Sequence, residues 1–139
     1  MKKIFLLLFI IQLVLVSYSQ TIRQKDKYGT PLYFVDGQTI KQKDKYGKAL
    51  YFLDCLTIKQ KDIYGNALYF IDGEKVRIKG KYGDAIFYFD GLTIKQKDTY
   101  GKSLYYLDGQ VLRIKDKYGE PIYYFECIPE KWIIVCLLQ

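Results

Sequence analysis

The sequence predicts an all-β protein made of six β-hairpins of equal length, arranged around one axis as a flower-like rosette. Two observations predict this fold. After the first twenty residues, the chain divides without insertion or deletion into six blocks of 18 residues. Each block has two short stretches rich in β-branched and aromatic residues, one on either side of a turn sequence. A copied unit of this size is too small to fold without its neighbours, so we expect the six units to form one domain.

The N-terminal segment has the pattern of an export signal. Two lysines precede an uncharged apolar run over residues 4–16, and a short segment with small residues ends at Ser19. This order is typical of a secretory signal peptide, and the apolar run is shorter than the roughly 20 residues of a membrane-spanning helix. We therefore expect residues 1–19 to form a signal-peptide helix that is cleaved before Gln20, which places the protein in the periplasm or outside the cell with no membrane span after cleavage. An uncleaved N-terminal anchor is the alternative.

The repeat domain is expected to span residues 20–128. Its blocks are residues 21–38, 39–56, 57–74, 75–92, 93–110 and 111–128. Position 5 of every block is Lys, position 8 is Tyr, position 9 is Gly and position 16 is acidic. Such regularity within one chain indicates a single supersecondary unit that was copied. An apolar tail, residues 129–139, follows, and we expect it to form a final strand or a cap over an open end.

The turn within each block is predicted by residues that recur in nearly every block. In the second block, Asp44 can bond back to the turn backbone and Gly47 can adopt positive φ. This combination is typical of a type I turn followed by a glycine bulge. Gly80 replaces the turn aspartate in the fourth block, so we expect that turn to lack its side-chain bond.

A three-residue loop at this turn fixes the expected register of each hairpin. It places Ile40 opposite Phe52 on one face and Lys41 opposite Tyr51 on the other. The first face is the more apolar, so we expect Ile40, Leu50 and Phe52 to be buried and the lysines of the other face to be exposed.

The connection between blocks decides how the hairpins assemble. If Asp36 and Gly37 form a two-residue turn, Tyr33 opposes Ile40 and equivalent side chains exchange faces. A continuous twelve-stranded sheet could then not keep equivalent side chains on one face, unless the connection is a three-residue loop. Separate hairpin blades around an axis avoid the problem, so we expect a closed rosette, with an open hairpin solenoid as the alternative.

The repeated unit resembles a known type of hairpin repeat. The pattern I-x-x-x-D-x-x-G-x-x-Φ-Φ-x-x-D, seen in residues 40–54, resembles the hairpin units of bacterial β-flower domains, in which symmetric hairpins form a small radial assembly. It is more faintly similar to choline-binding and glucan-binding repeats, whose Tyr-Tyr/Phe-x-Asp strand is echoed by residues 105–109. Those repeats build their ligand cage from tryptophans, whereas the single tryptophan of this chain, Trp132, lies outside the blocks. The β-flower resemblance implies a radial fold and brings no known activity with it.

Two sets of side chains are candidates for a ligand surface. The first set is the cation at position 3 of each block: Arg23, Lys41, Lys59, Arg77, Lys95 and Arg113. We expect the position 5 lysines to lie on the same face. The second set is the aromatic residue at position 13, which we expect to lie opposite these cations: Tyr33, Tyr51, Tyr69, Phe87, Tyr105 and Tyr123. A multivalent basic and aromatic surface suits an anionic polysaccharide or another component of the cell envelope, because weak contacts presented together become strong. The alternatives are solvated lysines on exposed strands and aromatic packing between blades.

The composition removes several classes of function. The chain has no histidine, so it offers no Ser/His or Cys/His dyad and no imidazole metal ligand. Its net charge of +7 comes from charges that alternate in sign along the chain, which argues against a nucleic-acid partner. The turns account for repeated carboxylates such as Asp26 and Asp36. We therefore expect a non-enzymatic binding or structural module without metal or cofactor, and the alternative is a cell-envelope glycan hydrolase that uses two of these carboxylates.

Three cysteines, at positions 55, 127 and 136, leave the redox state open. Cysteines of an exported chain can be oxidised to disulfides, and Cys127 and Cys136 are close enough in sequence for a disulfide to join the tail to the last hairpin. An odd number of cysteines leaves one thiol unpaired in any case.

Overall fold

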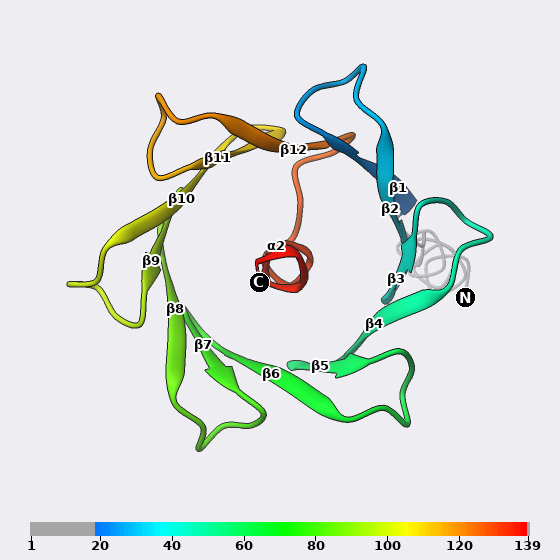
Figure 1. The fold of residues 1–139 in the computed structure, drawn as a ribbon. Coiled ribbons are helices and arrows are strands. Elements are labelled where there is room, and N and C mark those ends of the chain that lie inside the picture. The colour runs from blue at the N-terminus through cyan, green and yellow to red at the C-terminus, as the bar shows by residue number, and fades with distance from the viewer. Residues whose placement is uncertain (1–18, 139) are drawn as a thin grey trace, which may run out of the picture.

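The structure is a computed structural model, and it describes residues 19–138, so the expected signal peptide lies almost entirely outside the described residues. Within the described part of the chain, twelve antiparallel strands close into a barrel around a single helix (Figure 1). The elements are β1 (Ser19–Gln24), β2 (Pro31–Asp36), β3 (Thr39–Gln42), β4 (Ala49–Asp54), β5 (Thr57–Gln60), β6 (Ala67–Asp72), β7 (Lys75–Ile78), β8 (Ala85–Asp90), β9 (Thr93–Gln96), β10 (Ser103–Asp108), β11 (Val111–Ile114), β12 (Pro121–Phe125) and α2 (Lys131–Leu137).

Each block contributes one hairpin, which confirms the predicted all-β fold of repeated hairpins. The loops within the blocks point away from the barrel axis like six petals (Figure 1). The hairpins are not separate blades, however. Every strand pairs with its neighbours in the chain, and β1 pairs with β12, so both the predicted separate blades and the alternative open solenoid are wrong. Continuous pairing leaves the sheet without a free edge.

The connection between blocks lies one residue later than the sequence predicted. In the first connection, the loop residues are Gly37 and Gln38, and Val35 pairs with Ile40. Gly37 has φ of 62°, as the first loop residue of a type II′ turn requires. Equivalent apolar residues of neighbouring blocks therefore face the same side of the sheet, and the expected exchange of faces does not occur.

A β-bulge inside every block corrects the register of the hairpin itself. In the second block, Ile40 pairs with Tyr51 and Lys41 pairs with Ala49, so Leu50 is the extra residue between them. The predicted pairs, which were shifted by one residue on the second strand, are wrong. The bulge keeps one set of side chains inside the barrel over all six hairpins.

The bulge also changes which residues are buried. Ile40 is fully buried, as predicted, and so are its equivalents at position 2 of every block, all 0–1% exposed: Ile22, Ile58, Val76, Ile94 and Leu112. Leu50 and Phe52, which were predicted to be buried with Ile40, are only half-buried. Lys41 is half-buried as well, whereas Lys43 is exposed.

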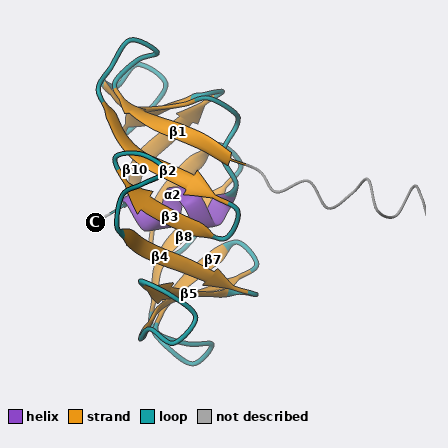
Figure 2. Ribbon diagram, turned by 90° about the vertical axis from the view of Figure 1, so that its right-hand side faces the viewer, coloured by secondary structure: helices purple, strands orange, loops and turns teal. Residues whose placement is uncertain are grey.

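The apolar tail forms helix α2 on the barrel axis and not a strand (Figure 2). Its residues from Trp132 to Leu138 are all buried, because the barrel surrounds the helix on every side. Lys131, at the start of the helix, donates to the backbone oxygen of Gly73 at 2.9 Å. Among the described residues, no helix has the length and hydropathy that crossing a bilayer requires.

The turn aspartates act as the sequence predicted. The carboxylate of Asp44 accepts a hydrogen bond from the backbone N–H of Tyr46 at 2.9 Å, and four other blocks repeat this bond. Because a glycine has no side chain to accept such a bond, the turn at Gly80 lacks it.

The invariant turn glycine has a different role from the one expected. Positive φ belongs to Lys43, at 68°, and not to Gly47. A Cβ atom on Gly47 would lie 1.6 Å from the carbonyl oxygen of Gln42. Glycine is therefore required at this position because two backbone segments approach each other closely.

Candidate functional site

The position 3 cations lie on the outer face of the barrel, where most of them are paired with an acid. Each pair joins position 3 of one block to the aspartate at position 16 of the preceding block. The pairs are Lys41–Asp36 at 3.1 Å, Lys59–Asp54 at 2.8 Å, Arg77–Asp72 at 2.9 Å, Lys95–Asp90 at 2.8 Å and Arg113–Asp108 at 3.1 Å. Arg23 donates to the backbone oxygen of Gly29 at 3.2 Å. Five of the six predicted ligand cations thus already have an anionic partner on the protein.

The position 13 aromatics lie on the opposite face of the barrel wall from these cations. They pack against the core cluster that the strands form with α2: Tyr33, Tyr51, Tyr69, Phe87, Tyr105 and Tyr123. The rings of Tyr33 and Tyr123 make an edge-to-face contact, with centroids 6.3 Å apart. Burial, followed by the neighbouring tyrosines, raises the pKa of Tyr123 above its ordinary value. The predicted alignment of these aromatics with the position 3 cations is therefore wrong.

A different set of aromatics lies beside the cations on the outer face. The position 14 residues pair across the strands with position 3, and they are Phe34, Phe52, Phe70, Tyr88, Tyr106 and Tyr124. All six are half-buried. Sequence reasoning missed this set because the bulge moves the facing residue by one position.

The position 5 lysines have an unusual backbone conformation. Their φ angles lie between 63° and 70°, in the left-handed region: Lys25, Lys43, Lys61, Lys79, Lys97 and Lys115. For a residue with a Cβ atom, the steric cost of this conformation is roughly 1–2 kcal/mol of free energy. The six side chains are exposed, and in residues 19–138 none of them forms an ion pair or a side-chain hydrogen bond. Every block therefore has, at position 5, a cation that remains available to a ligand.

Within residues 19–138, the most exposed aromatic rings lie at the tips of the six petals. The tyrosines at position 8 are 84–95% exposed: Tyr28, Tyr46, Tyr64, Tyr82, Tyr100 and Tyr118. In four blocks the preceding lysine stacks over the ring, with its Nζ atom 5.0–5.1 Å from the centroid. The sequence left the role of these tyrosines open. The structure places each of them, with its neighbouring cations, at the outer end of a hairpin.

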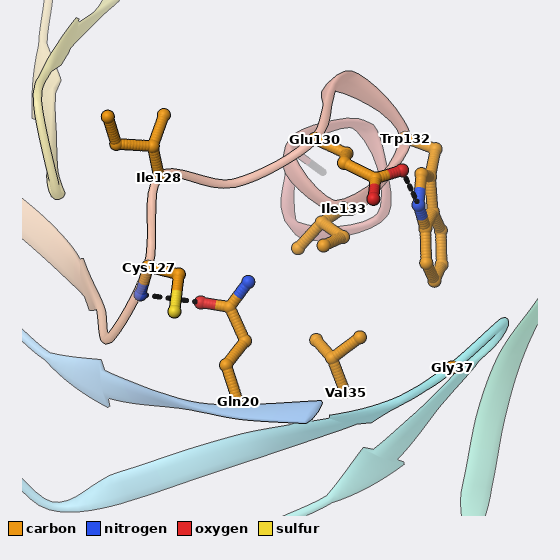
Figure 3. A pocket seen from close by; sticks show the side chains of 8 residues that line it. All are labelled: Gln20, Val35, Gly37, Cys127, Ile128, Glu130, Trp132 and Ile133. Carbon is orange, nitrogen blue, oxygen red and sulfur yellow. Dashed lines mark hydrogen bonds between the residues drawn. The ribbon is translucent and has the colours of Figure 1, made fainter. Parts of the chain in front are cut away.

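A cavity of about 410 Å³ lies between the segment that leads into α2 and the wall formed by β1 and β2 (Figure 3). Gln20, which was predicted to be the first residue after cleavage, is buried here, and its side-chain oxygen accepts from the backbone N–H of Cys127 at 3.3 Å. The carboxylate of Glu130 accepts from the indole N–H of Trp132 at 3.1 Å. Among the described residues that line this cavity, Glu130 is the single carboxylate, whereas glycoside hydrolysis ordinarily uses two. Ser19, on the other side of the predicted cleavage point, is the exposed first residue of β1.

The three cysteines are free and differ in their surroundings. Cys55 is exposed, Cys127 is half-buried and Cys136 is buried in α2. Burial raises the pKa of the Cys136 thiol well above its ordinary value, since the interior disfavours the thiolate.

Comparisons of the chain with protein-family models, with curated proteins and with solved structures gave no match. The functional proposal below is therefore based on the geometry of the outer face and the petals.

Proposed function

We propose that this protein is an exported, non-enzymatic binding module that presents a multivalent cationic and aromatic surface to an anionic polysaccharide of the cell envelope. Its radial arrangement of six petals is of the kind expected from the β-flower resemblance. Export is proposed from the signal-like pattern of residues 1–19. The observation that carries the proposal is the ring of six exposed position 5 lysines without side-chain partners.

Stability does not explain these lysines. Glycine adopts positive φ without steric cost, and the chain uses glycine at positive φ in four of its loops: Gly37, Gly73, Gly91 and Gly109. Nevertheless, position 5 is lysine in all six blocks. The protection of strand edges by lysine is not needed either, because every strand of the closed barrel has two neighbours. Backbone strain that recurs at an exposed charged residue favours a role in ligand recognition.

The proposal moves the ligand contacts from position 3 to positions 5 and 8. The position 3 cations are largely neutralised by their aspartates, so they add little to the field around the barrel. The position 5 lysines supply charge, and the exposed tyrosines at the petal tips supply flat apolar rings for sugar faces. Six equivalent weak contacts give a polymer high avidity, which a single sugar unit does not share.

The test is a variant in which all six position 5 lysines are changed to Asn, a residue that tolerates positive φ. Binding to immobilised polygalacturonate is measured by biolayer interferometry, with neutral dextran as the negative probe. We expect the variant to bind at least tenfold more weakly, with its thermal stability kept. A control variant, with the position 3 cations changed to Gln, should retain most of the binding. Unchanged binding in the Asn variant overturns the proposal.

A further inference from the structure

A groove runs between the petals of the second and third blocks. Two adjacent cavities form it, of about 440 and 530 Å³, and both are lined by Leu50 and Gln60. The first is completed by Tyr51, Leu68 and Tyr69, and the second by Lys48, Ala49 and Lys61. The cavities share two lining residues, we refer to them together as the groove, and the volume of each is within the size range of small-molecule sites.

The groove exists because two paired strands separate. The pairing of β4 with β5 ends at Tyr51 and Gln60, and beyond this pair the two chains diverge into separate petals (Figure 1). Leu50, the bulge residue, is half-buried, and its carbonyl oxygen accepts from the backbone N–H of Lys61 at 2.8 Å. Lys48 and Lys61 are both exposed. The groove thus combines a partly buried apolar surface with two cations, one from each petal.

Position 10, which lines this groove, differs most among the six blocks. From the first block to the sixth, position 10 is Thr30, Lys48, Asn66, Asp84, Lys102 and Glu120. Position 4 of the following block, taken in the same order, is Gln42, Gln60, Ile78, Gln96, Ile114 and Gln24. Position 5 of that following block is always Lys.

These differences distinguish one groove from its equivalents. Two of the other inter-petal positions bring Asp84 or Glu120 to the place of Lys48, which offsets the charge of the position 5 lysine. The inter-petal position with Lys102 has Ile114 in place of the amide of Gln60. Among the six inter-petal positions, all within residues 19–138, only the one between the second and third blocks joins two lysines to an amide.

We propose that this groove is a distinct binding site for a sugar ring that carries one anionic group, a carboxylate or a phosphate. The anionic group lies between Lys48 and Lys61, where charge-assisted hydrogen bonds are roughly twice as strong as neutral ones. The apolar face of the ring packs on Leu50, and the amide of Gln60 bonds a ring hydroxyl. This inference rests on the proposed function and identifies the unit of the polymer that one groove recognises.

The test titrates the isotope-labelled full-length protein with three probes and follows the backbone amides by NMR. The probes are methyl glucuronide, glucose 6-phosphate and neutral methyl glucoside. We expect one or both anionic sugars to shift the amides of Leu50, Gln60 and Lys61, and the neutral sugar to leave them in place. The stronger of the two anionic probes identifies the source of the charge. Equal shifts at the equivalent residues Ile86, Gln96 and Lys97 overturn the proposal.

Substitutions taken from other blocks provide matched variants that the fold already tolerates. Lys48→Asn copies Asn66 and should weaken binding at least fivefold, and Gln60→Ile copies Ile78 and should also weaken it. The control, Lys102→Asn, makes the same change in another groove and should have no effect. If Lys48→Asn and Lys102→Asn behave alike, the groove has no special role.

The outcome separates this inference from the proposed function. Polymer binding that depends on the six lysines, without any shift in the groove, leaves the multivalent module standing and removes the groove site. Binding of the single sugar at the groove, with polymer binding unaffected by the six Asn substitutions, leaves the groove site standing and removes the multivalent module.

Discussion

The backbone N–H of Lys61 donates to the carbonyl oxygen of Leu50 at 2.8 Å, and this bond joins one hairpin to the next. The same bond recurs at the other five block boundaries, over 2.8–3.1 Å. It satisfies the carbonyl group of the bulge residue, which the ladder of the sheet leaves free. Since only backbone atoms form the bond, the lysine side chain is not needed for it, and replacement of Lys61 by Asn preserves the connection between hairpins.

Cys55→Gly should stabilise the protein by about 1 kcal/mol, because Cys55 has φ of 57° at a position where four of the other five blocks have glycine. The free energy of unfolding is measured by urea denaturation. The reverse change in the next block, Gly73→Cys, is the control and should destabilise by a similar amount. A destabilised Cys55→Gly variant would show that the thiol makes a contact worth more than the strain.

Gly47→Ala should destabilise the protein by about 2 kcal/mol or more, because the added Cβ atom meets the carbonyl oxygen of Gln42. Gly80→Ala, one turn residue of the fourth block, is the matched control, since a Cβ atom there meets nothing within 4 Å. We expect its effect to stay within about 0.5 kcal/mol. Equal effects in the two variants, measured by thermal unfolding, would argue against the close backbone approach.

Ile40→Ala should cost about 2–5 kcal/mol of unfolding free energy, because Ile40 is fully buried and its removal leaves a cavity. Leu50→Ala should cost less, since Leu50 is half-buried beside the groove. Chemical denaturation of both variants gives the comparison. The opposite order would place the bulge residue in the core and contradict the register of the hairpin.

The stability of the protein should fall as the pH rises above about 9, the ordinary pKa of a cysteine thiol. Burial raises the pKa of Cys136 in the folded state, so the unfolded chain loses this proton first and is favoured at higher pH. Tyr69 and Tyr123 have raised pKa values too, mainly through burial, and they extend the loss above pH 10. Below pH 9, the neutral forms in both states leave stability unaffected by these groups.

The Cys136→Ala variant isolates the thiol in this pH dependence. Its unfolding free energy at neutral pH should be lower, because a buried sulfur is lost. Between pH 8.5 and 10, however, this free energy should decline less steeply with pH than in the parent, because unfolding of the variant releases on the order of one proton fewer. Urea denaturation across this range provides the measurement. An identical slope in the variant and the parent would mean that Cys136 does not control alkaline unfolding.

Local chemistry made much of this fold predictable. The exact repeat of block length and the turn sequence identify six hairpins. The turn can be predicted because the hydrogen bond from a backbone N–H to the aspartate side chain two residues before it is a local interaction. The burial of Ile40 and its equivalents follows from apolar side chains at one position of every block. The isolation of Lys43 on the surface follows in the same way from its place beside a turn.

Only the tertiary structure decided which face each side chain occupies. The side chains of a strand alternate, so the bulge at Leu50 moves Tyr51 inward and Phe52 outward, and no local signal marks the bulge. The pairing of Lys41 with Asp36, and with it the weakness of the predicted cation column, depends on the register between blocks. The tail is too short to hold a helix in water, and its apolar run does not distinguish strand from helix. It forms α2 because the closed barrel offers an apolar interior without free strand edges, and there a helix satisfies most of its own backbone hydrogen bonds.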